Sequence, residues 1–332
     1  MDAHGTNIDI GIAMGRIARS FVFLVSILAS GALWPGWSQP RQALKIVATI
    51  APIHSLVAGV TAGVTKPILL IPGGSSPHSF SLKPSDATAL ARADIIVRVG
   101  ETLESFLERP LAALGKQAKI VSLDEIDAMG LLAARQGGVW EHHDHESHGG
   151  HEPHNHGAGA HNPHIWLDPR NAIIAVDRIA KTASDLDPAN AQAYRQNAQA
   201  LKERLRLLDV ELKTTTAPIT SNPYVVFHDA YIYFERRYDL SPIGAVTVSP
   251  DRTPGARRLT EIRSKIADLG VVCVFSEPQF EPKLVETITS GMAARSAVLD
   301  PLGAAIEPGP DHYFTLLRNL ARTLTDCLSS QR

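Results

Sequence analysis

Short apolar runs alternate with longer amphipathic runs in two separate parts of this 332-residue chain. Strand-like runs followed by helix-like runs are typical of parallel sheets covered by helices, because parallel strands need a crossover connection. The sequence therefore predicts an α/β fold with two parallel-sheet lobes. Strands are expected at 45–50, 67–71, 94–99, 119–123, 224–227, 241–246, 271–275 and 297–299. Helices are expected from about Pro52, from Pro84, over 103–114 and 169–185, from about Ala230, Pro254 and Pro282, and over 311–328.

One uninterrupted run separates the two alternations. From Pro188 to about Thr215 the chain has no glycine and no interior proline, and strong helix formers dominate. About 27 such residues would form a single helix roughly 40 Å long. We expect one long rigid helix to bridge the lobes, which favours small lobe motions over a wide hinge closure. The expected boundaries are 40–186 for the first lobe, 187–216 for the linking helix and 217–332 for the second lobe.

The first 39 residues read as a signal peptide and leader. Arg16 and Arg19 precede a short apolar run, 21–29, and small residues follow it, which is the secretory pattern. The run is short for a bilayer span, although an N-terminal membrane anchor is the alternative. Met14 is a second candidate start. No cysteine follows the apolar run, which excludes a lipoprotein anchor, so the mature chain is expected to be exported and soluble.

The net charge and the cysteine content limit which binding partners and which cellular compartment are expected. The net charge of -2 shows no general basic bias toward nucleic acid. Cys273 lies in a strand-like run and Cys327 near the end of the last helix. In an oxidising compartment they can form one disulfide, which would stabilise by about 4 kcal/mol in the chain-entropy model. Two buried free thiols are the alternative.

Residues 141–169 hold nine of the 14 histidines. Neutral imidazole binds borderline metals such as Zn²⁺, Cu²⁺ and Ni²⁺. The part from 141 to 161 lacks the apolar residues that would offset its ordering entropy, so we expect a mobile loop that collects metal ions. A solvated linker that is merely rich in histidine is the alternative. The accessory ligands expected in this loop are His142, His143, His145, His148, His151, His154, His156 and His161.

Four residues outside that loop are candidates for one fixed metal site. His78, His228 and Asp300 each follow a predicted strand, where open α/β sheets place their ligand sites. His164 lies in the segment 163–169, whose flanking prolines indicate a fixed backbone. Three imidazoles and one carboxylate suit tetrahedral Zn²⁺. The sequence therefore predicts a zinc site at the interface of the two lobes.

Each candidate also has an ordinary structural alternative. A single histidine after a strand is often a turn or core residue, and Asp300 before a proline can be a turn residue. His54 is expected to have a helix-start role. His312 is expected to be exposed on the last helix. Glu277 is a candidate for contacting a metal ligand rather than the metal.

Five strings of this sequence, taken in order, resemble the solute-binding proteins of high-affinity bacterial zinc ABC importers. This family is the metal-binding cluster A-I, or bacterial solute-binding protein family 9. The resemblance covers nearly all of the mature chain, including the histidine-rich loop and the paired cysteines, and it implies two α/β lobes bridged by a long helix. The strings are IPGGSSPHSFSLKPSD (71–86), HNPHIWLDP (161–169), VVFHDAYIYFERRYDL (225–240), CVFSEPQF (273–280) and VLDPLG (298–303).

The resemblance implies a ligand set and a function. It matches His78, His164 and His228 with the three zinc-binding histidines, and Asp300 with a carboxylate that binds metal in related proteins. Close relatives often carry glutamate before the first histidine, but Pro77 stands here, which leaves Asp300 or a water as the fourth ligand. The implied protein is a periplasmic monomer and not an enzyme. It would capture Zn²⁺ and contact an inner-membrane ABC permease served by an ATPase.

Other functions are kept as alternatives. A manganese or other divalent-metal binder of the same family is one, although manganese-type relatives usually carry a carboxylate where His228 stands. A secreted zinc hydrolase would use an open metal position to activate water, but the chain has no HExxH motif and no obvious base beyond Glu277 and the acidic residues of the loop. An adhesin or metal buffer without a transporter would differ only in its partner.

Overall fold

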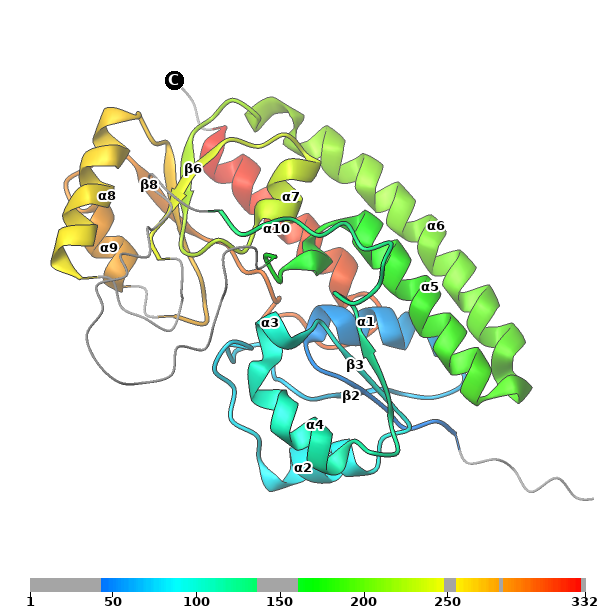
Figure 1. Cartoon of the computed structure of the whole chain (residues 1–332). Coiled ribbons are helices and arrows are strands. Elements are labelled where there is room, and N and C mark those ends of the chain that lie inside the picture. The colour runs from blue at the N-terminus through cyan, green and yellow to red at the C-terminus, as the bar shows by residue number, and fades with distance from the viewer. Residues whose placement is uncertain (1–42, 136–160, 248–254, 281–282, 330–332) are drawn as a thin grey trace, which may run out of the picture. The chain divides into compact units, whose positions relative to one another are not determined.

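The computed structural model describes residues 43–135, 161–247, 255–280 and 283–329 (Figure 1). The expected leader and all of the histidine-rich loop except His161 lie outside these residues. Within the described part of the chain, no helix combines the length and the apolar character needed to cross a membrane.

The first half of the chain builds a four-stranded parallel sheet with strand order β2-β1-β3-β4. The two central strands are buried along their whole length, as their continuous Ile and Val residues require. The strands are β1 (Ile46–Ala48), β2 (Ile68–Leu69), β3 (Ile95–Arg98) and β4 (Lys119–Ser122).

The helices of this half are α1 (Ala51–Val60), α2 (Pro84–Ala91), α3 (Glu101–Glu104) and α4 (Glu108–Leu114), with the 3-10 helix η1 (Ser105–Leu107) between the last two. The single helix predicted over 103–114 is therefore divided. Pro110 explains the division, because proline is tolerated in the first turn of a helix and disrupts its interior.

The second half repeats the same topology. Its four parallel strands are ordered β6-β5-β7-β8, which is again second, first, third, fourth in chain order. The strands are β5 (Tyr224–Val226), β6 (Pro242–Ala245), β7 (Cys273–Ser276) and β8 (Arg295–Val298). The helices are α7 (Ile232–Arg237), α8 (Ala256–Asp268), α9 (Lys283–Thr289) and α10 (His312–Leu328). The predicted α/β fold with two parallel-sheet lobes is confirmed.

A disulfide joins β7 to α10. Cys273 and Cys327 are bonded, with their Cα atoms 6.1 Å apart. The bridge closes a loop of sequence separation 54. The predicted pairing is confirmed, and it connects the sheet of the second half to the last helix.

The long helix is also confirmed. The 3-10 helix η3 (Pro188–Asn190) leads into α6 (Ala191–Thr216), which has 26 residues. The helix packs against α5 (Pro169–Leu186), α1 and α10 along one face, and Figure 1 shows α5 and α6 side by side. Its buried residues recur at the helical spacing that one apolar face requires. They include Tyr194, Ala198, Leu201, Leu205, Leu208 and Leu212. The exact domain boundaries stay predictions.

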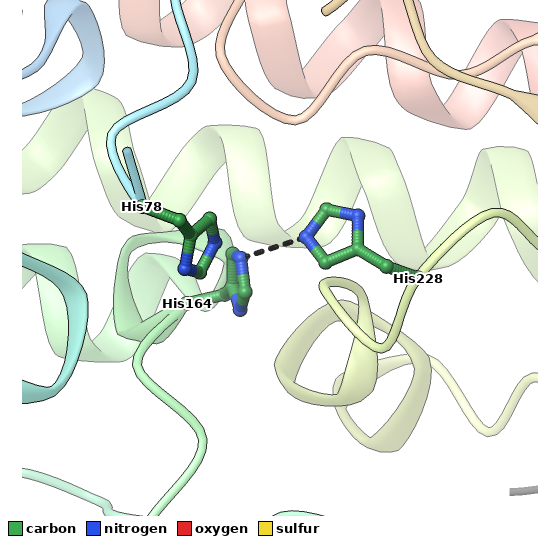
Figure 2. A group of neighbouring side chains, drawn as sticks. All are labelled: His78, His164 and His228. Carbon is green, nitrogen blue, oxygen red and sulfur yellow. Dashed lines mark hydrogen bonds between the residues drawn. The ribbon is translucent and has the colours of Figure 1, made fainter. Parts of the chain in front are cut away.

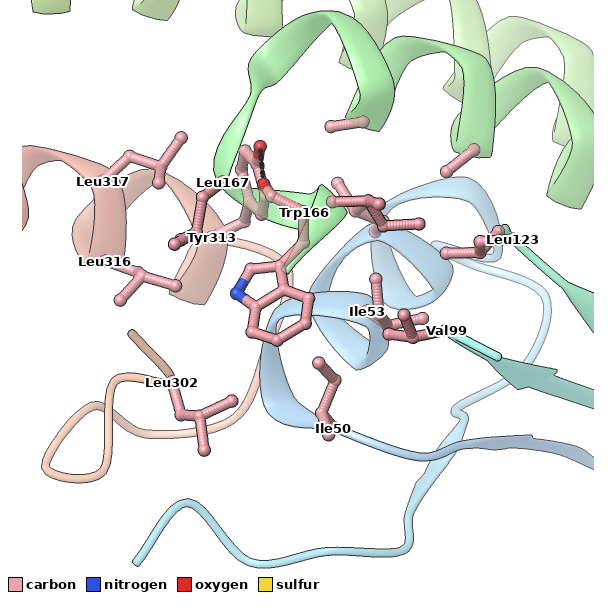
Figure 3. Packing of buried hydrophobic residues seen from close by; sticks show 14 of the residues in the cluster. Ile50, Ile53, Val99, Leu123, Trp166, Leu167, Leu302, Tyr313, Leu316 and Leu317 are labelled. Carbon is pink, nitrogen blue, oxygen red and sulfur yellow. Dashed lines mark hydrogen bonds between the residues drawn. The ribbon is translucent and has the colours of Figure 1, made fainter. Parts of the chain in front are cut away.

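Trp166 lies where the hydrophobic cores of the two halves meet. Figure 3 shows its indole among Ile50 and Ile53 from the first half and Leu302 and Tyr313 from the second. The indole Nε1 donates to the Pro301 carbonyl at 2.9 Å, and the Tyr313 hydroxyl donates to the Trp166 carbonyl at 2.7 Å. One continuous buried cluster thus includes strands of both sheets, and this arrangement holds the loops of the candidate site in fixed positions.

Candidate metal centre

Three histidines from distant parts of the sequence converge on one point (Figure 2). His78 lies on the loop between β2 and α2, and His228 follows β5 by two residues. His164 precedes the 3-10 helix η2 (Ile165–Leu167). Each residue offers a ring nitrogen, and these nitrogens lie within 4.8 Å of one another. His164 and His228 are buried and His78 is half-buried.

Asn162 fixes which nitrogen of His164 carries the proton. The Asn162 amide Nδ2 donates to the Asp229 carbonyl, and its Oδ1 accepts from the His164 backbone N–H at 3.0 Å. These two bonds set the orientation of the amide, so Oδ1 is also the atom 2.9 Å from His164 Nδ1. An amide oxygen only accepts, so Nδ1 must be the protonated nitrogen. His164 Nε2 is therefore left with a free lone pair.

Glu277 has the same effect on His228. Its Oε1 lies 2.7 Å from His228 Nδ1, and the Glu277 side chain is completely buried. A carboxylate accepts this hydrogen bond, which places the proton on Nδ1 and leaves Nε2 of His228 as a second lone pair. A carboxylate behind a metal-binding histidine also raises the ligand's basicity.

The two unprotonated nitrogens face each other. His164 Nε2 and His228 Nε2 are 3.1 Å apart. Two lone pairs at this distance cannot hydrogen-bond, but they can both bind one cation. Two nitrogens each about 2.0–2.1 Å from a tetrahedral Zn²⁺ would lie roughly 3.3–3.4 Å apart. The arrangement therefore fits a metal ion with little adjustment.

The space between the histidines is very small. The cavity measures about 10 Å³, and a single water needs roughly 10–15 Å³. Trp166, Phe280 and Pro301 contribute apolar walls to it. The cavity has room for a single ion or one water-sized ligand.

Burial keeps His164 uncharged. Desolvation lowers the pKa of His164 well below its ordinary value of 6.5, and the nearby His228 and His78 rings lower that pKa further. The neutral imidazole is the form that binds metal.

A pH dependence follows from this lowered pKa. The unfolded chain takes up a proton at His164 near pH 6.5, whereas the folded chain resists it. This contribution to stability is present above the unfolded-state pKa and is lost as pH falls towards the folded-state pKa. We expect the Tm of the metal-free protein to decrease from about pH 7 to about pH 5, with zinc affinity falling over the same range because protons compete for the ligands. Calorimetry of this protein and a His164→Asn variant measures both effects, and an equal Tm slope in the two proteins would contradict the assignment.

Asp300, the fourth residue predicted for the site, is not in the three-histidine group. Its Oδ1 accepts from the backbone N–H groups of Leu302 and Gly303, each at 3.0 Å, and its Oδ2 accepts from the Ala304 N–H. The Gln279 amide also donates to Oδ1 at 3.0 Å. The carboxylate thus closes the turn after β8, and its role as a metal ligand stays a prediction.

The remaining predicted residues have structural partners. His54 lies in the first turns of α1, and its Nε2 is 3.2 Å from the Pro67 carbonyl. The prediction that His312 is exposed is wrong, because its side chain is buried and its Nε2 is 2.8 Å from the Leu302 carbonyl. The first turn of α10 packs inward here, and a side chain on Gly303 would collide with the His312 ring. Glu277 contacts His228, the candidate ligand, as predicted.

Sequence reasoning missed Asn162 and Gln279. Asn162 joins the loop of His164 to the backbone beside His228, and Gln279 joins Asp300 to the loop that carries His78 through the Gly73 carbonyl at 3.2 Å. An Asn-Pro pair directly before a candidate ligand was the available signal for Asn162, but that pair more often marks a turn.

Comparison with known proteins assigns this chain to a family. Residues 46–327 match the model of the family described as zinc-uptake complex component A, periplasmic. This match includes all three histidines and nearly all of the described residues. The chain belongs to this family. It is a family of solute-binding proteins.

Individual proteins that are similar to this chain support the assignment. The high-affinity zinc uptake system protein ZnuA of Brucella suis is 43% identical over 329 residues, which cover 93% of this chain and 98% of that protein. A crystal structure of ZnuA superposes with a TM-score of 0.71 at 25% identity, covering 86% of this chain and 100% of that one. The solute-binding protein FpvC of Pseudomonas aeruginosa in complex with Mn²⁺ superposes with a TM-score of 0.72 at 26% identity, covering 87% and 100%.

Proposed function

We propose that this protein captures Zn²⁺ in the periplasm and delivers it to an inner-membrane ABC permease for zinc uptake. The observation that carries the proposal is the pair of bare Nε2 atoms of His164 and His228, held 3.1 Å apart by Asn162 and Glu277. His78, on the loop between β2 and α2, supplies a third ring nitrogen. Membership of the zinc-uptake family supports the same function.

The donor atoms favour zinc over manganese. Imidazole nitrogens suit Zn²⁺, whereas Mn²⁺ prefers carboxylate and water oxygens. The Glu277 carboxylate uses one oxygen to orient His228 and does not join the nitrogen cluster. We infer a site of His78, His164 and His228, with the Asp300 carboxylate or a water as the fourth ligand. Asp300 would have to give up hydrogen bonds within its turn to bind the metal.

The size of the site favours binding over catalysis. A zinc hydrolase needs an open metal position beside a substrate pocket. The cavity of about 10 Å³ admits no such substrate. We therefore infer a carrier that is not an enzyme. We also propose that it acts as a monomer beside the permease and its ATPase. The eight accessory histidines from His142 to His161 would concentrate Zn²⁺ near the buried site through many weak contacts.

Growth of the host tests this function. Deleting the gene for this protein is expected to stop growth in medium depleted of zinc by a chelator, and added Zn²⁺ is expected to restore it. The full-length gene should restore growth at low zinc, whereas a His164→Ala gene should not. Rescue of the deletion strain by Mn²⁺ but not by Zn²⁺ would assign the protein to manganese uptake instead.

A further inference from the structure

A second pair of metal-ligating side chains includes the last histidine of the histidine-rich segment. His161 is the last histidine of that loop, and its Nε2 lies 3.3 Å from the Asp124 Oδ2. Asp124 follows β4, at the carboxyl end of the first sheet, where open α/β sheets place ligands. We call these two residues the lateral pair.

The backbone at His161 and the side chain of Asp124 are both held in place. An isolated antiparallel bridge joins His161 to Ala133, and the next residue, Asn162, donates its backbone N–H to the Leu132 carbonyl at 2.7 Å. The Asp124 side chain is only 9% exposed. It fits against Gly100, where any Cβ would lie 1.8 Å from Asp124 Oδ2, so glycine makes the space that the carboxylate occupies.

The hydrogen bonding of the lateral pair is incomplete. Among the described residues, neither His161 Nε2 nor Asp124 Oδ1 has a hydrogen-bond partner, although both atoms are buried. The ring and the carboxylate approach each other without the geometry of a hydrogen bond. A buried polar atom without a partner costs about 1–3 kcal/mol, so such atoms call for an explanation, and an unfilled ion site is one.

The separation of the two atoms matches shared coordination. A nitrogen and an oxygen each about 2.0–2.1 Å from a tetrahedral Zn²⁺ lie roughly 3.3–3.4 Å apart. The lateral pair has this spacing and combines an imidazole with a carboxylate, a donor set that zinc accepts. With only two protein ligands the other positions fall to water, so an ion here would be weakly held and easily released.

We propose that His161 and Asp124 form a separate, weak Zn²⁺ site, distinct from the buried three-histidine centre. This inference rests on the proposed zinc-binding function and identifies Asp124 as a ligand. The site lies in the same short segment as His164, because His161 precedes that residue by three positions. Zinc released by the loop would thus be held next to the segment that carries a ligand of the buried centre.

The test isolates this site from the other loop histidines. The parent protein is the full mature chain with the seven histidines from His142 to His156 changed to asparagine. After chelator stripping, it is titrated with Zn²⁺ by calorimetry and by equilibrium dialysis. We expect two equivalents, one tight and one weak. Asp124→Asn and His161→Asn are each expected to remove the weak equivalent and to leave the tight one unchanged.

Control variants separate a lost ligand from a lost fold or a lost charge. Glu125→Gln removes a neighbouring exposed carboxylate and should keep both equivalents. His161 is partly exposed, so His161→Asn should fold even if Asp124→Asn does not. A weak equivalent that is absent from the parent, or that survives both substitutions, would overturn the lateral site. Absence of the tight equivalent from the parent would instead overturn the proposed function.

Discussion

Replacing His164 with alanine is expected to abolish tight zinc binding by the mature protein. The substitution removes one of the two opposed Nε2 atoms, and among the described residues only His78 and His228 remain as nitrogen ligands at this point. Loss of a residue behind a metal ligand typically lowers affinity about 10–100-fold, and loss of the ligand itself should exceed that. Calorimetric titration against a competing chelator measures the change.

Two further variants serve as comparisons for His164→Ala. Glu277→Gln keeps the shape of the residue that orients His228 but removes its charge, so an intermediate loss of about 10–100-fold is expected. His148→Ala changes one histidine of the loop and should leave the tight constant unchanged. If His164→Ala bound zinc as tightly as the unaltered protein, the three-histidine centre would be wrong, and the chain would be a histidine-rich buffer.

Replacing Trp166 with alanine is expected to lower the free energy of unfolding by about 3–5 kcal/mol, the usual cost of removing a large aromatic side chain from a core. The indole is 2% exposed, contacts the cores of both halves and donates a hydrogen bond to the Pro301 carbonyl. Urea unfolding of the metal-free protein measures the change.

The matched control for this variant is Leu207→Ala. Leu207 lies on α6 and is 64% exposed, so its truncation should change the free energy of unfolding by no more than about 0.5 kcal/mol. A loss below about 1 kcal/mol for Trp166→Ala would show that the two halves do not depend on a shared core at this residue. In that case the lobes would be expected to unfold in separate transitions.

Local pattern was sufficient for most of the fold. Eight short apolar runs became eight strands. The pattern is clearest in β1 and β3, whose continuous Ile and Val residues suit strands buried on both faces. The run from Pro188 to Thr215 became one helix because nothing in it interrupts helical hydrogen bonding. The helix expected over 103–114 is divided at Ser105–Leu107, so that Pro110 falls in the first turn of α4, where proline is tolerated.

Local pattern was less informative about the surroundings of single polar residues. His312 was expected to be exposed because histidine on a terminal helix usually is, but the first turn of α10 packs against the turn that Asp300 closes. Asp300 was expected to bind metal because it follows a strand, and the same position lets it accept backbone hydrogen bonds from 302–304.

The sequence by itself determined the elements, their two parallel-sheet groups and the residue types able to bind zinc, because these depend on neighbours along the chain. Only the tertiary structure decided which of those residues meet. His164 and His228 are separated by 64 positions, and His228 and Glu277 by 49. Such contacts depend on how the strand ends and loops pack around Trp166. The proton positions on the two imidazoles depend on those contacts, and so do the two facing lone pairs of the candidate metal centre.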